Sequence, residues 1–186
     1  MTTNNKKQKQ KKIVEPPMQL ELTTKLNTPW QLYFHDDPQS WDKESYHEFG
    51  PVIETIESYI HIIHNLKSVV GINTANLYLF RTCSHPRWED KTNANGIAWS
   101  MKTNLDNGLN NFIYICDKLV SENSLKPRND FDMNGFVNGI SLSYKEIHYI
   151  IKVMISNKKT NNVNFIAKDI LNVNRHSDII WQNIVL

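Results

Sequence analysis

The spacing of hydrophobic and polar positions changes along the chain, and it predicts a mixture of strands and helices. In the run 96–102, Ile97, Trp99 and Met101 fall on one face, as on a strand with one buried side. A helix is predicted to begin at Pro51 and continue through Ile63, because its apolar residues recur at helical spacing. Further strand-like runs occupy 30–35, 76–81, 135–143, 146–156 and 179–186, and further helical runs occupy 106–122 and 160–171.

The order of these elements indicates a fold class. The predicted helices separate groups of strands rather than single strands, and two of the strand-like runs, 135–143 and 146–156, are close enough to form a hairpin. This order favours an α+β fold, with an antiparallel sheet and helices stacked on one face. A length of 186 residues fits a single domain with a substantial core.

The first 25 residues differ in composition from the rest of the chain. Residues 1–14 hold five lysines and no acidic residue, and Pro16 and Pro17 follow them. This segment has no sustained hydrophobic period. We therefore expect a disordered basic tail at 1–25 and one folded domain at 26–186.

The lysines of the tail make the net charge of the whole chain differ in sign from that of the predicted domain. The whole chain has 21 basic and 19 acidic residues, a net charge of +2. Without the five lysines of residues 1–14, 16 basic residues remain against 19 acidic ones, a net charge of −3. General binding to a phosphate backbone needs clustered Lys and Arg, so it is not expected here. Any recognition of nucleic acid should use stacking and specific hydrogen bonds.

Several classes of protein are excluded by what the sequence lacks. It has no run of 18 apolar residues and no apolar signal region, so we expect no membrane association, and the two cysteines indicate a reducing compartment, the cytoplasm. The common motifs for nucleotide hydrolysis, hydride transfer and metalloprotease chemistry are absent. His61 and His64 lie three residues apart, but no third ligand is evident. The sequence predicts neither an enzyme, a metal site nor a bound cofactor.

The five tryptophans carry more information. Trp30 and Trp99 fall in alternating strands, and Trp181 lies in the last strand-like run, so all three are expected to pack in the core or at its edge. Trp41 and Trp88 lie in polar, turn-rich loops, where burial is not the usual role of so large a ring. A function in binding is therefore expected for these two, although loop tryptophans also mark protein interfaces.

A carboxylate next to one of these loop tryptophans suggests a ligand. Glu89 and Asp90 follow Trp88 directly. Two indole rings can stack on both sides of a planar base, more strongly if the base is positively charged. A carboxylate accepts the two hydrogen bonds that the Watson–Crick edge of guanine donates. A base that is both cationic and doubly donating is 7-methylguanine.

The run Pro86-Arg87-Trp88-Glu89-Asp90, with Trp99 eleven residues after Trp88, resembles eukaryotic translation initiation factor 4E. The similarity extends over about 26–171. That family binds the 7-methylguanosine cap of messenger RNA, and its members fold as a cupped antiparallel sheet with three helices on the convex back. The resemblance implies that Trp41 and Trp88 stack on the cap base and that Glu89 binds its edge. It also implies that Trp30 and Trp99 belong to the framework.

The residues for the cap phosphates depart from the family pattern. Family members have a basic residue before the tryptophan that matches Trp99, where this chain has Ala98. They have further basic residues on the strand that aligns with 135–145, where this chain has Ser141 and Ser143. The remaining candidates for the cap triphosphate are Lys145 and Lys152.

The surface for protein partners departs as well. The family binds the initiation scaffold factor 4G through a tryptophan on the first helix and through residues of the second, and here Ile60 stands at the tryptophan position. Tyr114 and Asp117 also replace the usual residues. We expect either a scaffold of the factor 4G type with an altered motif or no such partner. The residues predicted for this surface are Leu26, Ile56, Ile60, Ile113 and Tyr114.

Three functions therefore compete. The first is a monomeric, cytoplasmic, divergent cap-binding protein of translation initiation, from an AT-rich genome such as that of a protist or a large virus. The second is a decoy or translational repressor that keeps the fold but binds caps weakly, as the missing phosphate ligands suggest. The third, a His- or Cys-dependent hydrolase, would need a metal or a reactive thiol that the sequence does not supply.

Overall fold

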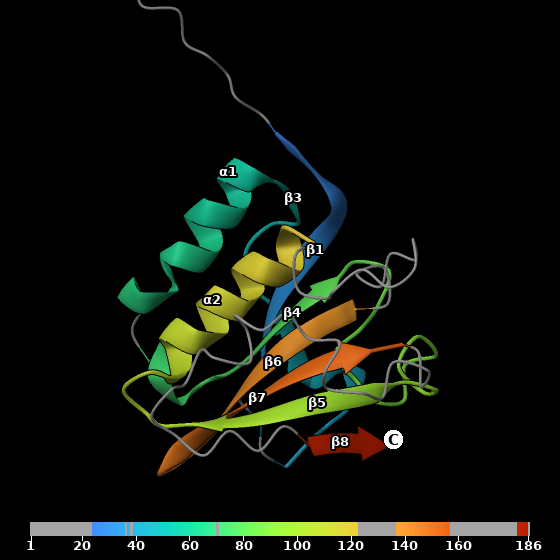
Figure 1. The fold of residues 1–186 in the computed structure, drawn as a ribbon, viewed down its shortest axis with the longest axis vertical. Helices are drawn as coiled ribbons and strands as arrows, with labels where there is room; N and C mark the ends of the chain where they lie inside the picture. Colours follow the sequence, from blue (N-terminus) through green and yellow to red (C-terminus); the bar gives the residue numbers. More distant parts are fainter. Residues whose placement is uncertain are drawn as a thin grey trace, which may run out of the picture.

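The computed structural model describes residues 24–35, 37, 39–69, 71–122 and 137–156, and the backbone of 182–185 (Figure 1). The tail before residue 24, the helix expected at 160–171 and Trp181 lie outside the described residues.

An antiparallel sheet of eight strands organises the fold, in the order β2-β1-β4-β6-β7-β5-β8, with β3 paired to β1. The helices α1 and α2 lie on the same side of this sheet (Figure 1). The α+β class and the antiparallel sheet are therefore confirmed. The strands are β1 Lys25–His35, β2 Tyr46–Glu48, β3 Ile53–Thr55, β4 Asn76–Arg81, β5 Ile97–Thr103, β6 Val137–Lys145, β7 His148–Ile155 and β8 Gln182–Val185. The helices are α1 Ile56–Tyr59, which continues as a π-helical turn at Ile60–His64, and α2 Gly108–Val120, with short 3-10 turns at Lys43–Ser45, Leu66–Ser68 and Ile72–Thr74.

The first helix begins later than the sequence predicted. The sequence predicted a helix from Pro51, but Ile53–Thr55 forms β3, in which Ile53 pairs with Trp30 of β1 and is fully buried. The helix begins at Ile56, after Thr55. The Thr55 hydroxyl accepts a hydrogen bond from the Ser58 backbone N–H, and the Ser58 hydroxyl accepts one from that of Thr55. This reciprocal cap fixes the helix start, because it satisfies two backbone donors at the turn.

The first strand is longer than the sequence suggested. It was predicted over 30–35, yet β1 begins at Lys25, where it pairs with Thr55 of β3. Strand β1 thus begins one residue before 26, the residue at which the folded domain was expected to start.

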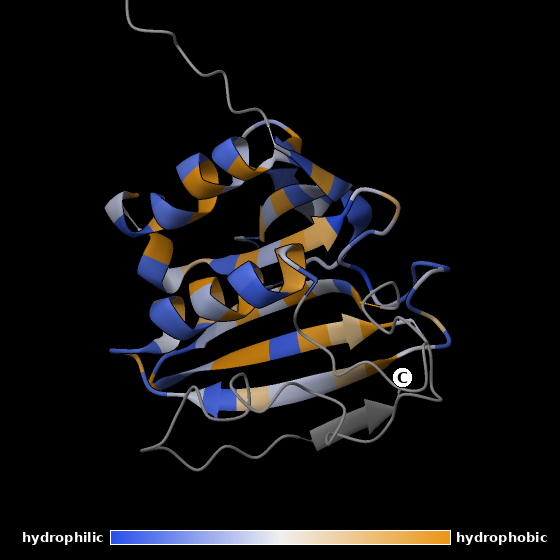
Figure 2. Cartoon of the chain, turned by 45° about the horizontal axis from the view of Figure 1, so that its top comes forward, coloured by the Kyte–Doolittle hydropathy of each residue, from blue (hydrophilic) through white to orange (hydrophobic). Residues whose placement is uncertain are grey.

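The two faces of the sheet carry different sets of buried residues. Trp30 and Trp99 are each 1% exposed and belong to the main core, where the sheet meets both helices. Their predicted role in the core is confirmed. Both helices carry hydrophobic and hydrophilic stripes (Figure 2). A second, smaller cluster contains Ala98, the neighbour of Trp99, so it lies on the opposite face. Its other buried members are Tyr33, Tyr46, Tyr78, Phe80 and Met154, and Trp88 packs against it.

Candidate nucleotide-binding site

A pocket of about 260 Å³ opens over this second cluster, on the sheet face away from the helices. It brings together four residues that the sequence singled out separately: Trp41, Trp88, Lys145 and Lys152. The volume lies just below the roughly 300–1,000 Å³ of ordinary ligand pockets, so it suits one planar group. The remaining lining residues are Tyr46, Tyr78, Pro86, Ser141, Ser143, Ile150 and Met154.

Two buried amides hold the loop that carries Trp88. The Asn93 side chain is 1% exposed, and its Nδ2 donates to the backbone oxygens of His85 (2.8 Å) and Arg87 (2.6 Å). Asn138 of β6 donates in turn to Asn93 Oδ1 at 2.7 Å. The backbone just before Trp88 is therefore tied to the sheet. Sequence reasoning missed both asparagines, because neither Asn93 in a polar loop nor Asn138 in a strand-like run gives a local signal of a buried hydrogen bond between them.

Replacing Asn93 by alanine should loosen this loop. The variant removes the donor to the His85 carbonyl, one of two donors to the Arg87 carbonyl and one of two acceptors of the Asn138 amide. Each buried polar group left unsatisfied costs about 1–3 kcal/mol. We expect a lower unfolding temperature and faster amide exchange over 84–94. The exposed Asn95 provides the matched control, Asn95→Ala, which should change neither. Equal exchange in the two variants would contradict this role for Asn93.

The two carboxylates after Trp88 have different surroundings. Asp90 Oδ1 accepts hydrogen bonds from the backbone N–H of Thr92 (2.9 Å) and from its hydroxyl (2.5 Å), so Asp90 is engaged in the turn of its own loop. The Glu89 side chain is 68% exposed, and its Oε2 lies 3.4 Å from Arg87 Nε. Such an exposed ion pair is weak, so the Glu89 carboxylate can reorient at little cost. Glu89 does not line the pocket itself, but its neighbour Trp88 does.

Trp41 is supported from behind by a histidine. The rings of Trp41 and His35 are stacked, with centroids 4.5 Å apart and planes 9° from parallel. His35 is fully buried, and its Nε2 donates to the Ser40 carbonyl at 2.7 Å. Trp41 remains 53% exposed, so its other face is open to a ligand. The sequence indicated Trp41 but gave no sign of His35.

The phosphate candidates stand at different depths. Lys145 is exposed at the end of β6, whereas Lys152 is half-buried in the middle of β7. Burial, and secondarily the nearby Lys145, lower the pKa of Lys152. Ser141 pairs with Lys152 across the two strands, and it lines the pocket with Ser143.

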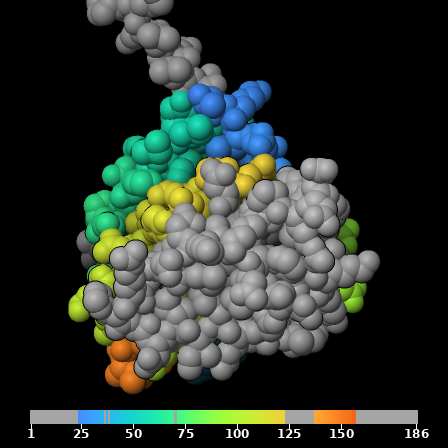
Figure 3. Space-filling model, viewed as in Figure 1, coloured from blue at the N-terminus to red at the C-terminus, as the bar shows by residue number. Residues whose placement is uncertain are grey.

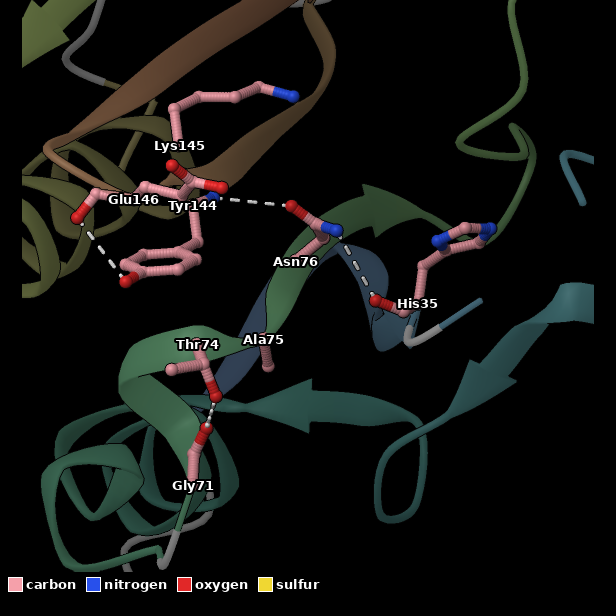
Figure 4. Close-up of a pocket in the computed structure, with 8 residues that line it drawn as sticks. All are labelled: His35, Gly71, Thr74, Ala75, Asn76, Tyr144, Lys145 and Glu146. Carbon is pink, nitrogen blue, oxygen red and sulfur yellow. Dashed lines mark hydrogen bonds between the residues drawn. The ribbon is translucent and has the colours of Figure 1, made fainter. Parts of the chain in front are cut away.

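A second pocket, of about 710 Å³, adjoins this region and shares Lys145 with it. Its walls come from the start of β4, the end of β1 and the β6–β7 turn (Figure 4). Tyr144 N–H donates to Asn76 Oδ1 at 3.2 Å, and Asn76 Nδ2 donates to the His35 carbonyl at 3.5 Å. These bonds join β1, β4 and β6 at the end of the sheet that carries Lys145.

On the opposite face, α1 and α2 form a continuous surface beside the start of β1 (Figure 3). Tyr59 donates from its hydroxyl to Asp117 Oδ1 at 2.7 Å, which connects the two helices. The prediction for Ile113 is corrected by the structure. Ile113 was predicted on the partner surface, but its side chain is only 7% exposed, because its side of α2 packs in the main core. Four of the residues predicted for this surface are exposed or partly exposed: Leu26, Ile56, Ile60 and Tyr114.

The described residues give little support for a metal site or a thiol-based site. His64 Nε2 lies 3.0 Å from Asp117 Oδ1, and the described residues hold no group of three or more side chains suited to a metal ion. Cys83 and Cys116 are free thiols, one exposed and one buried. Within the described part of the chain, no helix has the length and apolar character needed to cross a membrane.

Together, these features define a two-layer α+β protein, with helices on one face of an antiparallel sheet and an aromatic-lined pocket on the other. The family model described as Eukaryotic initiation factor 4E matches residues 25–184. The chain therefore belongs to the eukaryotic initiation factor 4E family.

Individual proteins are similar to this chain in sequence or in fold. Eukaryotic translation initiation factor 4E-1 of Zea mays is 33% identical over 87 residues, which cover 42% of this chain and 38% of that protein. The match thus spans well under half the length of the relative. Among solved structures, initiation factor 4E-3 of C. elegans, in complex with the 4E-binding protein Mextli and a cap analog, aligns with a TM-score of 0.71. It is 16% identical, over 88% of this chain and 92% of that one. Initiation factor 4E-3 of Ascaris suum, in complex with an m2,2,7G cap, aligns with a TM-score of 0.68 and 16% identity, over 87% and 91% of the two chains.

Proposed function

We propose that this chain binds the 7-methylguanosine cap of messenger RNA in the pocket between Trp41 and Trp88, and that it acts in translation initiation. The observation that carries the proposal is the convergence of two indole rings from separate loops on one small pocket. Membership of the initiation factor 4E family supports it. Solved structures of similar fold include complexes with a cap or cap analog and complexes with a 4E-binding protein.

The chemistry of the pocket suits a cationic base. The open face of Trp41 and the ring of Trp88 provide two electron-rich surfaces for stacking, and methylation at N7 adds a positive charge that strengthens this attraction. Glu89 would accept the hydrogen bonds from the guanine edge, since Asp90 is already engaged by Thr92. Lys145, exposed at the rim, would contact the triphosphate.

The helical face would serve a protein partner. Ile56 and Ile60 are 41% and 51% exposed, and Tyr114 lies on the neighbouring helix. Exposed apolar residues grouped on one face are typical of docking sites. A partner of the factor 4G type, with a motif altered to suit Ile60, would connect the bound cap to the initiation machinery. In this role the chain is a monomeric binding protein of the cytoplasm and not an enzyme.

Retention on immobilised 7-methyl-GTP tests this function. The full chain should be retained and should be released by free 7-methyl-GTP, whereas the same concentration of GTP should leave it bound. Capped RNA should compete for the resin, and the same RNA without a cap should not. Failure to bind the resin, or equal release by the two nucleotides, would contradict the proposal.

A second candidate is a decoy that binds partners but binds caps weakly. It is favoured by Ala98, Ser141 and Ser143, uncharged residues on the pocket face where family members have cations. A decoy should compete for a 4E-binding protein while it fails to stay on the cap resin, so the same experiment separates the two functions.

A further inference from the structure

One cation of the pocket lies against the ring that the proposed function assigns to the base. Lys152 Nζ is 5.2 Å from the centroid of the Trp88 ring. This is within the roughly 6 Å over which an ammonium is attracted to an aromatic face. Both residues line the same pocket. In the free protein, the Trp88 indole therefore already has a positive charge beside it.

The surroundings of Lys152 give its charge little other support. Its partners across the sheet are Ser100 on β5 and Ser141 on β6, both uncharged. None of the ion pairs among the described residues involves Lys152. Burial and Lys145 both lower the pKa of Lys152, so each of them disfavours the ammonium form. The indole is thus the one group seen to offset the cost of this charge in the described part of the pocket.

We propose that a nucleotide exchanges places with Lys152: the base takes the Trp88 ring, and the displaced ammonium moves onto the phosphates of the same ligand. The inference rests on the proposed function, because it takes Trp88 as the stacking ring. A cationic base and an ammonium repel each other at such a distance, so they do not share the ring favourably. The ligand class that satisfies both groups carries a base and an anion together, as a nucleoside phosphate does.

This exchange makes Lys152 a specificity-determining residue. A nucleoside without phosphates must displace the ammonium and offers it no new partner, so Lys152 should oppose its binding. A nucleoside triphosphate displaces the ammonium and then pairs with it. The contribution of the phosphates to affinity should therefore be larger than an exposed lysine alone would give.

The test compares the full chain with Lys152→Met, which keeps an unbranched chain of similar length but removes the charge. Calorimetric titrations with 7-methylguanosine and with 7-methyl-GTP measure each affinity. In Lys152→Met we expect the affinity for 7-methylguanosine to rise about 3- to 30-fold. The gain in affinity from the triphosphate should shrink in the same variant.

Lys145→Met is the matched control, because Lys145 lines the same pocket without lying over the ring. It should lower the affinity for 7-methyl-GTP without raising that for the nucleoside. Lys152→Gln repeats the test with a polar side chain if the methionine variant does not fold. If the original chain binds 7-methyl-GTP and neither Lys152 variant gains affinity for 7-methylguanosine, the proposed exchange is wrong. The proposed cap-binding function is then unaffected. If the original chain binds neither ligand, the proposed function fails, and the exchange fails with it.

Discussion

Replacing Trp88 by alanine should lower the affinity for 7-methyl-GTP about 5- to 150-fold, because one stacked ring contributes roughly 1–3 kcal/mol. Trp41→Ala should have an effect of the same size. The two indole rings reach the pocket from separate loops, and Trp41 keeps one face open because His35 stacks on the other. Fluorescence titration measures the affinity of both variants, since stacking on a ligand quenches the emission of the pocket tryptophan that each variant retains.

Trp88→Phe separates stacking from packing. Trp88 also contacts the second cluster around Tyr46 and Tyr78, so its loss could lower affinity through the fold. Phenylalanine keeps an aromatic face and part of the packing, and it should restore part of the affinity. If Trp88→Ala and Trp41→Ala both bound 7-methyl-GTP normally, the two tryptophans would be interface residues and the pocket would not be the cap site.

Glu89→Gln is expected to have the second large effect. The change removes a charge and turns one acceptor into a donor that faces the donors of guanine. Hydrogen bonds to a charged group are worth about 1.5–3 kcal/mol, so the affinity for 7-methyl-GTP should fall roughly 10- to 150-fold. Isothermal calorimetry with the folded variant gives this ratio.

Asp90→Asn provides the comparison for Glu89. Asp90 Oδ1 is bonded to Thr92, so its replacement should lower the stability of the loop more than the affinity for the base. Thermal unfolding should therefore respond more to Asp90→Asn, and cap affinity more to Glu89→Gln. The opposite ranking of the two affinities would assign the base edge to Asp90.

The residues that sequence reasoning found are those whose chemistry conflicts with their local context. A large apolar ring in a polar loop, as at Trp41 or Trp88, has no obvious reason to be there except a ligand or a partner. Lys145 and Lys152 were found differently, as the cations left for the cap triphosphate once the family's usual basic positions proved to be uncharged. The structure brings these residues to one pocket, although they are far apart in the chain.

The residues that were missed fit their local context and gain their role only from long-range contacts. Asn93 is an ordinary loop residue until Asn138, 45 positions later, bonds to its amide. His35 becomes a support for Trp41 only through the turn between them. The error at the start of the first helix has the same origin, because the pairing of Ile53 with Trp30 in β1 outweighs a helical spacing that continues through 51–63. Ile113 was misplaced because spacing alone does not say which apolar positions at a helix margin are covered.

The central claim is that the pocket recognises a cationic guanine, and parallel titrations of the full chain with 7-methyl-GTP and GTP test it most directly. The two ligands share their phosphates, so they differ in the charge and the methyl group of the base. Stacking of a charged ring between Trp41 and Trp88 predicts that 7-methyl-GTP binds more tightly, by about 2- to 30-fold or more. Equal affinities for the two nucleotides at the same salt concentration would contradict it.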